Sequence, residues 1–201
     1  MSVDRLDYYF DFLSPYAYFA WPRAKAACAA RGLELAPHPV LLAGLLNHWG
    51  QLGPAEVPPK REFTFKDCFR YAGLHGIPFI GPTSHPFNPL LVLRLASKEV
   101  AGDQQIAVID ALWHAVWGVG IDPASAAEVT AALDAAGLEG ATLVAKAQTP
   151  PAKEALRLET AAALEHQVFG VPTFIAGGEL FWGNDRIDSL ERYLDGKDTV
   201  D

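Results

Sequence analysis

Apolar and polar residues alternate along the start of the chain, which predicts a β-strand. One face of this strand carries Leu6, Tyr8, Phe10 and Phe12, and the other carries Asp7, Tyr9 and Asp11. Helical spacing then replaces the alternation from Pro15 to about Arg31, and Gly32 lies where a C-terminal stop is expected. Residues 33–40 form a second predicted strand, whose two prolines favour an edge position. This strand–helix–strand order favours a parallel pair with a right-handed crossover.

The middle of the chain, from about residue 41 to residue 167, has helical patterns and almost no strand pattern. The predicted helices are one after Asp103 with an apolar stripe to Trp117, one from Asp122-Pro123 to Gly137, and one from Thr149-Pro150. Strand patterns return at 171–176 and 179–182 around a glycine hairpin turn, before a last helix from about Asp185 to Leu194. These elements predict an α/β protein whose sheet is interrupted by a helical insertion.

Ser14 lies where the first strand meets the first helix, directly before a proline that suits the first helical position. Its hydroxyl is therefore expected among free backbone N–H groups at the positive end of the helix. Such a place stabilises an anion. An ordinary serine N-cap gives the same pattern, so the position alone does not establish a site.

Composition narrows the classes of function. The chain has 201 residues and a net charge of −8, and it has no Lys/Arg cluster, which argues against a nucleic-acid surface. Its longest apolar run, residues 40–46, is too short to cross a bilayer. The N-terminus lacks the basic and apolar regions of a signal peptide, so a cytoplasmic protein is expected.

Cysteine and histidine spacing gives no metal site. Cys28 and Cys68 lack a CxxC or metal-type spacing and are expected to be reduced and buried. The six histidines likewise show no metal-ligand spacing. No metal is expected.

Three short motifs carry a family resemblance: Phe-Asp-Phe-Leu-Ser-Pro-Tyr (10–16), Phe-Gly-Val-Pro-Thr (169–173) and Trp-Gly-Asn-Asp-Arg (182–186). With them the chain resembles, over nearly its whole length, the 2-hydroxychromene-2-carboxylate isomerases, thioredoxin-fold glutathione enzymes related to the kappa-class glutathione transferases. The resemblance implies a discontinuous thioredoxin-like domain, residues 1–40 and 168–201, with residues 41–167 as an inserted helical domain. It also implies a homodimer.

The resemblance assigns glutathione to residues near these motifs. Ser14, Pro15 and Tyr16 would hold the thiolate at the start of the helix, and Val171 with a cis Pro172 would pair with the tripeptide as an added strand. Asn184 and Asp185 would bind the γ-glutamyl end, although either could be a routine N-cap. Gln51 stands where the family most often has an asparagine that contacts the tripeptide.

Substrate contacts are expected from Lys60, Asn88 and Trp182, with a plain surface lysine and a helix cap as the simpler interpretations of the first two. Tyr16, Phe63, Trp117 and Trp182 could form an aromatic pocket for a bicyclic acid.

The resemblance implies a glutathione-dependent isomerase that acts on 2-hydroxychromene-2-carboxylate or a similar aromatic unsaturated keto acid, by reversible thiolate addition and elimination. The alternative is a kappa-like glutathione transferase that conjugates electrophiles. A non-catalytic thioredoxin-like binding module is a third possibility from another class. A disulfide oxidoreductase is excluded because no cysteine occurs at residues 14–17.

Overall fold

The computed structural model describes residues 3–198, and its four strands form one mixed sheet in the order β2-β1-β3-β4. The strands are β1 (Arg5–Phe10), β2 (Glu34–Pro39), β3 (Thr173–Ala176) and β4 (Glu179–Trp182). β1 lies parallel to β2, at the sheet edge, and antiparallel to β3, whose Thr173 is opposite Tyr9. The sheet therefore joins strands from both ends of the chain, as predicted. Met1 and Ser2, on which the expectation about a signal peptide partly depends, lie outside the described residues.

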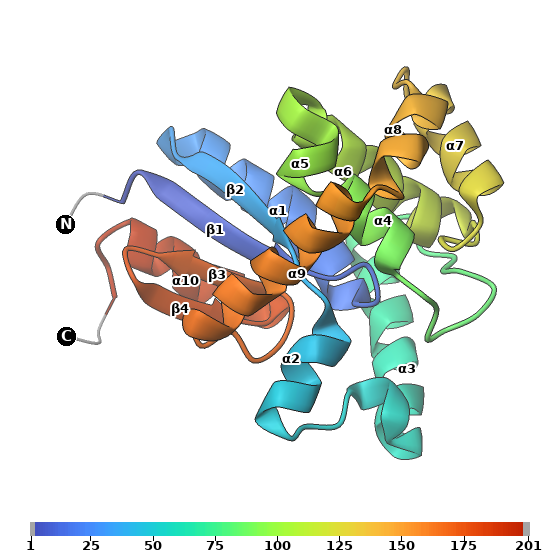
Figure 1. The fold of residues 1–201 in the computed structure, drawn as a ribbon. Coiled ribbons are helices and arrows are strands. Elements are labelled where there is room, and N and C mark those ends of the chain that lie inside the picture. Colours follow the sequence, from blue (N-terminus) through green and yellow to red (C-terminus); the bar gives the residue numbers. More distant parts are fainter. Residues whose placement is uncertain (1–2, 199–201) are drawn as a thin grey trace.

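The helices cover both faces of the sheet and extend beyond one of its ends (Figure 1). α1 and α10 lie on one face and α9 lies on the other, while α4, α6, α7 and α8 are grouped beyond the end of the sheet. Their bounds are α1 (Pro15–Arg31), α2 (Leu42–Trp49), α3 (Pro58–His75), α4 (Leu90–Leu95), α5 (Lys98–Ala101), α6 (Gln105–Trp113), α7 (Ala126–Ala135), α8 (Gly140–Ala147), α9 (Pro150–Glu165) and α10 (Ile187–Leu194).

Aromatic side chains build the core beside β1. Leu6, Tyr8 and Phe10 are fully buried on the face that α1 covers, where the Tyr8 hydroxyl donates to the carbonyl oxygen of Ala17 over 2.7 Å. The same cluster of buried side chains continues into the helical insertion, because the ring of Phe12 lies 4.4 Å from that of Trp113. The core is therefore continuous between the two parts of the chain, and the domain division at residues 40 and 168 stays a prediction.

Two helices differ from their expected bounds. The stripe through Trp117 is not one α-helix, because α6 ends at Trp113 and a π-helical segment, η3 (His114–Val119), continues it. The helix expected from Asp122-Pro123 begins three residues later, at Ala126, where Ser125 caps it. The reason is local: the carboxylate of Asp122 accepts the N–H of Ala124 and forms a turn instead.

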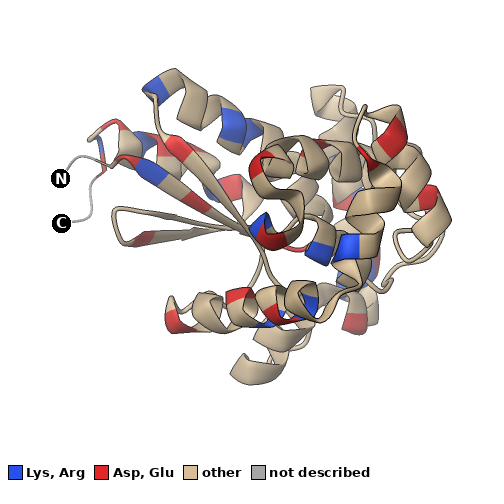
Figure 2. Ribbon diagram, turned by 45° about the horizontal axis from the view of Figure 1, so that its top comes forward, with Lys and Arg blue, Asp and Glu red and all other residues tan. Residues whose placement is uncertain are grey.

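Acidic and basic residues are interspersed over the helices in Figure 2. Among residues 3–198, no helix combines the length and the apolar character needed to cross a membrane.

Candidate functional site

Ser14 is the N-cap of α1, as predicted. Its backbone is extended, Pro15 occupies the first turn, and its Oγ accepts the N–H of Ala17 over 3.2 Å. The side chain is almost buried, with 8% exposed. The hydroxyl is therefore held at the positive end of a helix of four to five turns, where a partial positive charge favours an anion.

The loop before β3 lies against Ser14. The Val171–Pro172 peptide bond is cis, as predicted, and the carbonyl oxygen of Val171 lies 3.5 Å from Ser14 Oγ. This loop is held from the other side, because Gly183 N–H donates to the carbonyl oxygen of Pro172 over 2.9 Å. Within residues 3–198, the N–H of Val171 has no hydrogen-bond partner. An extended peptide could therefore pair with Val171 beside the start of α1.

Asn184 and Asp185 differ sharply in their surroundings. Asn184 is 5% exposed, and its carbonyl oxygen accepts from Arg23 of α1. Its Oδ1 is a buried acceptor for which residues 3–198 provide no partner. Asp185 is largely exposed and pairs with Arg186 over 3.2 Å. Gly183 makes this turn with a φ of 111°, and a Cβ at this position would lie 2.5 Å from an oxygen of Asp185. An unpaired buried acceptor is costly and so indicates a place for an external donor.

Gln51 lies directly beyond α2, in a surface pocket of about 390 Å³ next to the cis-proline loop. Its lining consists of Trp49, Gln51, Gln167, Phe169 and Leu180. Trp49 Nε1 donates to the carbonyl oxygen of Val168 over 3.0 Å, which fixes the end of α2 against the loop. Trp182 packs against the same loop, since its ring centre is 5.1 Å from that of Phe169.

Tyr16 connects the first turn of α1 to α3. Its hydroxyl donates to Asp67 Oδ2 over 2.7 Å, and burial together with this hydrogen bond raises the pKa of the phenol well above its ordinary value. Cys28 and Cys68 are both free and buried, as predicted. Burial raises the pKa of these thiols to about 11 and about 12, so neither is a thiolate at neutral pH.

Two of the expected substrate residues lie at the surface of the protein. Lys60 and Asn88 are both exposed, and neither makes a hydrogen bond or ion pair with the Ser14 turn among residues 3–198. Asn88 Oδ1 accepts the N–H of Leu90, two residues further on. The N-cap of α4 is Pro89, so the alternative interpretation of Asn88 as a helix cap before Pro89 is wrong. Phe63 is also exposed.

The place expected for Trp117 in an open aromatic pocket is wrong. Its ring is fully buried and stacks on Phe79, and its Nε1 donates to the carbonyl oxygen of Phe12 over 2.9 Å. Trp117 therefore belongs to the core below the Ser14 turn.

Sequence reasoning missed two residues that hold the Ser14 turn. Asp11, expected on the polar face of β1, is fully buried. Burial raises the pKa of its carboxyl to about 7, against hydrogen bonds from Leu13 and Leu42 that lower it. His85 Nε2 lies 2.9 Å from the carbonyl oxygen of Leu13. An aspartate inside an otherwise aromatic run was the one available signal; nothing in the local sequence marks His85.

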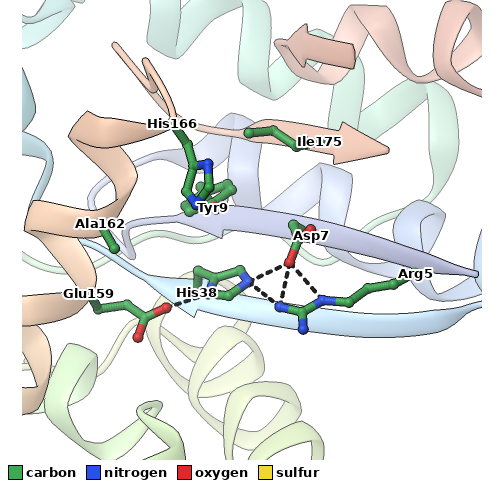
Figure 3. Close-up of a pocket in the computed structure, with 8 residues that line it drawn as sticks. All are labelled: Arg5, Asp7, Tyr9, His38, Glu159, Ala162, His166 and Ile175. Carbon is green, nitrogen blue, oxygen red and sulfur yellow. Dashed lines mark hydrogen bonds and ion pairs between the residues drawn. The ribbon is translucent and has the colours of Figure 1, made fainter. Parts of the chain in front are cut away.

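A second polar cluster lies on the face of the sheet that α9 covers (Figure 3). His38 of β2 lies between Asp7 of β1, at 2.8 Å, and Glu159 of α9, in a small cavity of about 190 Å³. Arg5 also contacts Asp7, so every charge in the cluster has a partner. The cluster contains no residue of the Ser14, Gln51 or Asn184 segments and ties α9 to the sheet. Among residues 3–198, no group of three potential metal ligands occurs.

Known proteins are similar to this chain in both sequence and fold. The 2-hydroxychromene-2-carboxylate isomerase of Sphingobium xenophagum is 30% identical over 94% of this chain and 97% of its own. A solved structure of such an isomerase has a TM-score of 0.86 and 30% identity, and it covers 95% of this chain and 94% of that one. The chain belongs to the 2-hydroxychromene-2-carboxylate isomerase family.

The wider relations agree with this family. The model of the DsbA-like thioredoxin domain matches residues 5–195, which confirms the predicted fold class. A glutathione S-transferase kappa 1 of Rattus norvegicus is 28% identical over 96% of this chain and 91% of its own. The names of these relatives support an enzyme of the isomerase or glutathione-transferase type.

Proposed function

We propose that the protein is a glutathione-dependent isomerase that acts on 2-hydroxychromene-2-carboxylate or a similar aromatic unsaturated keto acid. One observation carries the proposal: the N-terminus of α1, with the nearly buried Ser14 hydroxyl, meets the cis-proline loop, with 3.5 Å between Ser14 Oγ and the Val171 carbonyl oxygen. A thiolate and an extended peptide are the two chemical parts of glutathione. The two halves of this site suit them respectively.

Within residues 3–198, one backbone N–H and one buried side-chain oxygen lack a hydrogen-bond partner, and each can bind glutathione. The N–H of Val171 has no partner within residues 3–198, and it can pair with a carbonyl of the tripeptide. The buried Oδ1 of Asn184 can accept from the ammonium or an amide of the tripeptide. Gln51, at the mouth of the neighbouring pocket, is within the same surface region as the loop.

When bound, glutathione would supply a thiolate that adds reversibly to a conjugated carbon, so that the double bond can change its geometry before the sulfur leaves. Ser14 is proposed to hold that sulfur in its ionised form, by donating from its hydroxyl at the positive end of the α1 dipole. The half-exposed Trp182 offers an aromatic surface beside the loop for a bicyclic substrate. Asp185, Lys60 and Asn88 remain proposed contacts at the outer edge.

A kappa-like glutathione transferase is the second candidate, because the rat relative carries that name and the Ser14 site serves either reaction. The two reactions differ in what happens to sulfur. An isomerase releases glutathione unchanged after each turnover, whereas a transferase consumes one thiol for each product.

The test measures free thiol and product absorbance together while the purified protein acts on 2-hydroxychromene-2-carboxylate with catalytic glutathione. We expect many turnovers at constant thiol. Loss of one thiol for each product formed would favour the transferase. No isomerisation with glutathione present would reject the isomerase proposal, and a no-protein reaction serves as the control.

A further inference from the structure

Asp11 holds three backbone N–H groups at the point where β1 ends. Its Oδ1 accepts the N–H of Leu13 and its Oδ2 accepts the N–H of Leu42, each over 2.9 Å. Its carbonyl oxygen accepts the N–H of Ser14, also over 2.9 Å. The whole residue is inaccessible to solvent, so these bonds are not exchanged with water.

The two carboxylate bonds connect segments that are far apart in the chain. The Leu13 bond fixes the backbone immediately before Ser14. The Leu42 bond caps α2, whose own N-cap residue, Leu41, has no side-chain acceptor. A negative group at that end also suits the helix dipole.

α2 connects Asp11 with the segment that leads to the cis-proline loop. Trp49, at its last position, bonds to the carbonyl oxygen of Val168 in the segment that leads to the cis-proline loop. Gln51, which follows the C-cap residue Gly50, lines the pocket there. We call residues 42–51 the α2 arm. The buried Asp11 carboxylate thus contacts the first residue of the α2 arm and the backbone directly before Ser14.

A buried carboxylate at this position lowers the stability of the fold. Burial disfavours its charged form, and within residues 3–198 no cation pairs with it. A neutral cap such as serine could satisfy one N–H, but only a carboxylate has two equivalent acceptor oxygens and no donor. This loss of stability has a reason if the Ser14 turn and the α2 arm must keep one geometry relative to each other.

We infer that Asp11 is a positioning residue of the proposed glutathione site, which holds the Ser14 turn and the α2 arm in one geometry so that the sulfur and the peptide of glutathione bind together. The inference rests on the proposed function. Asp11 itself touches neither glutathione nor substrate; it acts through the two segments.

Two variants each disrupt the hydrogen bonds between the Asp11 carboxylate and these two segments. Asp11→Asn keeps the shape but turns an amide NH₂ toward one of the two N–H groups. Leu42→Pro removes the N–H that Oδ2 accepts, and proline suits the first position of α2 after the extended Leu41. Asp134→Asn is the matched control, because Asp134 likewise accepts a backbone N–H, that of Gly140 over 2.8 Å, far from these segments in the α7–α8 connection.

Calorimetric titration measures the Kd of glutathione for each variant, and steady-state kinetics measures kcat. Each link variant should raise the glutathione Kd about tenfold, the equivalent of one lost charge-assisted hydrogen bond, with kcat at saturating glutathione changed less than about threefold. The control should bind like wild type. The Kd effect of Asp11→Asn should also be non-additive with that of Trp49→Phe, since both act through the α2 arm.

The outcomes separate the inference from the proposed function. Wild-type protein that binds no glutathione rejects the proposed function. Wild-type binding together with a Kd within twofold for folded Asp11→Asn and Leu42→Pro overturns the inference alone. If Asp11→Asn does not fold, Leu42→Pro decides, because it leaves the buried carboxylate in place.

Discussion

Replacing Ser14 with alanine separates its capping role from its proposed role on sulfur. In the free protein, Ser14 Oγ accepts one helical N–H over 3.2 Å and has only a long, 3.5 Å contact to the cis-proline loop. Losing an N-cap costs about 1 kcal/mol. For a chain of this length that corresponds to a fall in Tm of about 2–4 °C.

The chain offers a matched control in Ser125, which caps α7 in the same way by accepting the N–H of Glu128 over 3.3 Å. Ser125→Ala should therefore lower Tm about as much as Ser14→Ala. Only Ser14→Ala should raise the thiol pKa of bound glutathione, which an ultraviolet thiolate titration of the complex measures. Its turnover should fall by about 10²–10³, as when one donor to an anion is removed.

The comparison has a clear adverse result. If the two alanine variants lose equal stability and also share the wild-type thiol pKa and turnover within twofold, Ser14 is a cap and no more. A loss of glutathione binding in both variants would indicate a general loss of structure instead.

Two further predictions follow from the surroundings of the site. Burial acts to lower the pKa of His38, but its hydrogen bonds to the Asp7 and Glu159 carboxylates outweigh burial and raise this pKa overall. The folded protein therefore binds a proton that the unfolded chain releases above about pH 6.5. The loss of unfolding free energy in His38→Gln should thus be largest between about pH 5 and 6.5 and shrink as pH rises through the raised pKa; urea unfolding that shows a pH-independent loss would contradict this. Asn184→Ala removes an acceptor that has no partner among residues 3–198, so Tm should hold while glutathione binds about tenfold more weakly. Asp185→Ala, at an exposed site, should weaken binding no more than about fivefold. Equal calorimetric affinities for wild type and Asn184→Ala would place Asn184 outside the site.

The predictable parts of this fold depend on chemistry that acts over a few residues. Ser14 before Pro15 can be interpreted as a helix start because both residues satisfy local backbone rules. The family motif predicted the cis bond at Val171, and the structure has it. The split sheet followed from strand patterns confined to the two ends of the chain.

The parts that could not be predicted depend on which elements meet. The alternation predicts Asp7, Tyr9 and Asp11 on one face, but β1 ends at Phe10, and nothing local shows that Asp11 is buried just beyond it. The same holds for Trp117, which could equally line a pocket or fill a core. Ser125 caps α7 in place of Asp122, whose carboxylate accepts the N–H of Ala124 in a turn, and the local sequence suits either start.

The sheet order also affects how the protein is synthesised. β1 lies between β2, which follows it closely, and β3, and Ser14 is 157 positions away from Val171. At ordinary rates of translation, β1 waits on the order of ten seconds on the ribosome with one edge unpaired. An unpaired edge is a template for association with other chains. The α/β core of this protein is therefore completed only when β3 and β4 emerge, and chains that lack these strands are expected to be the more prone to aggregation.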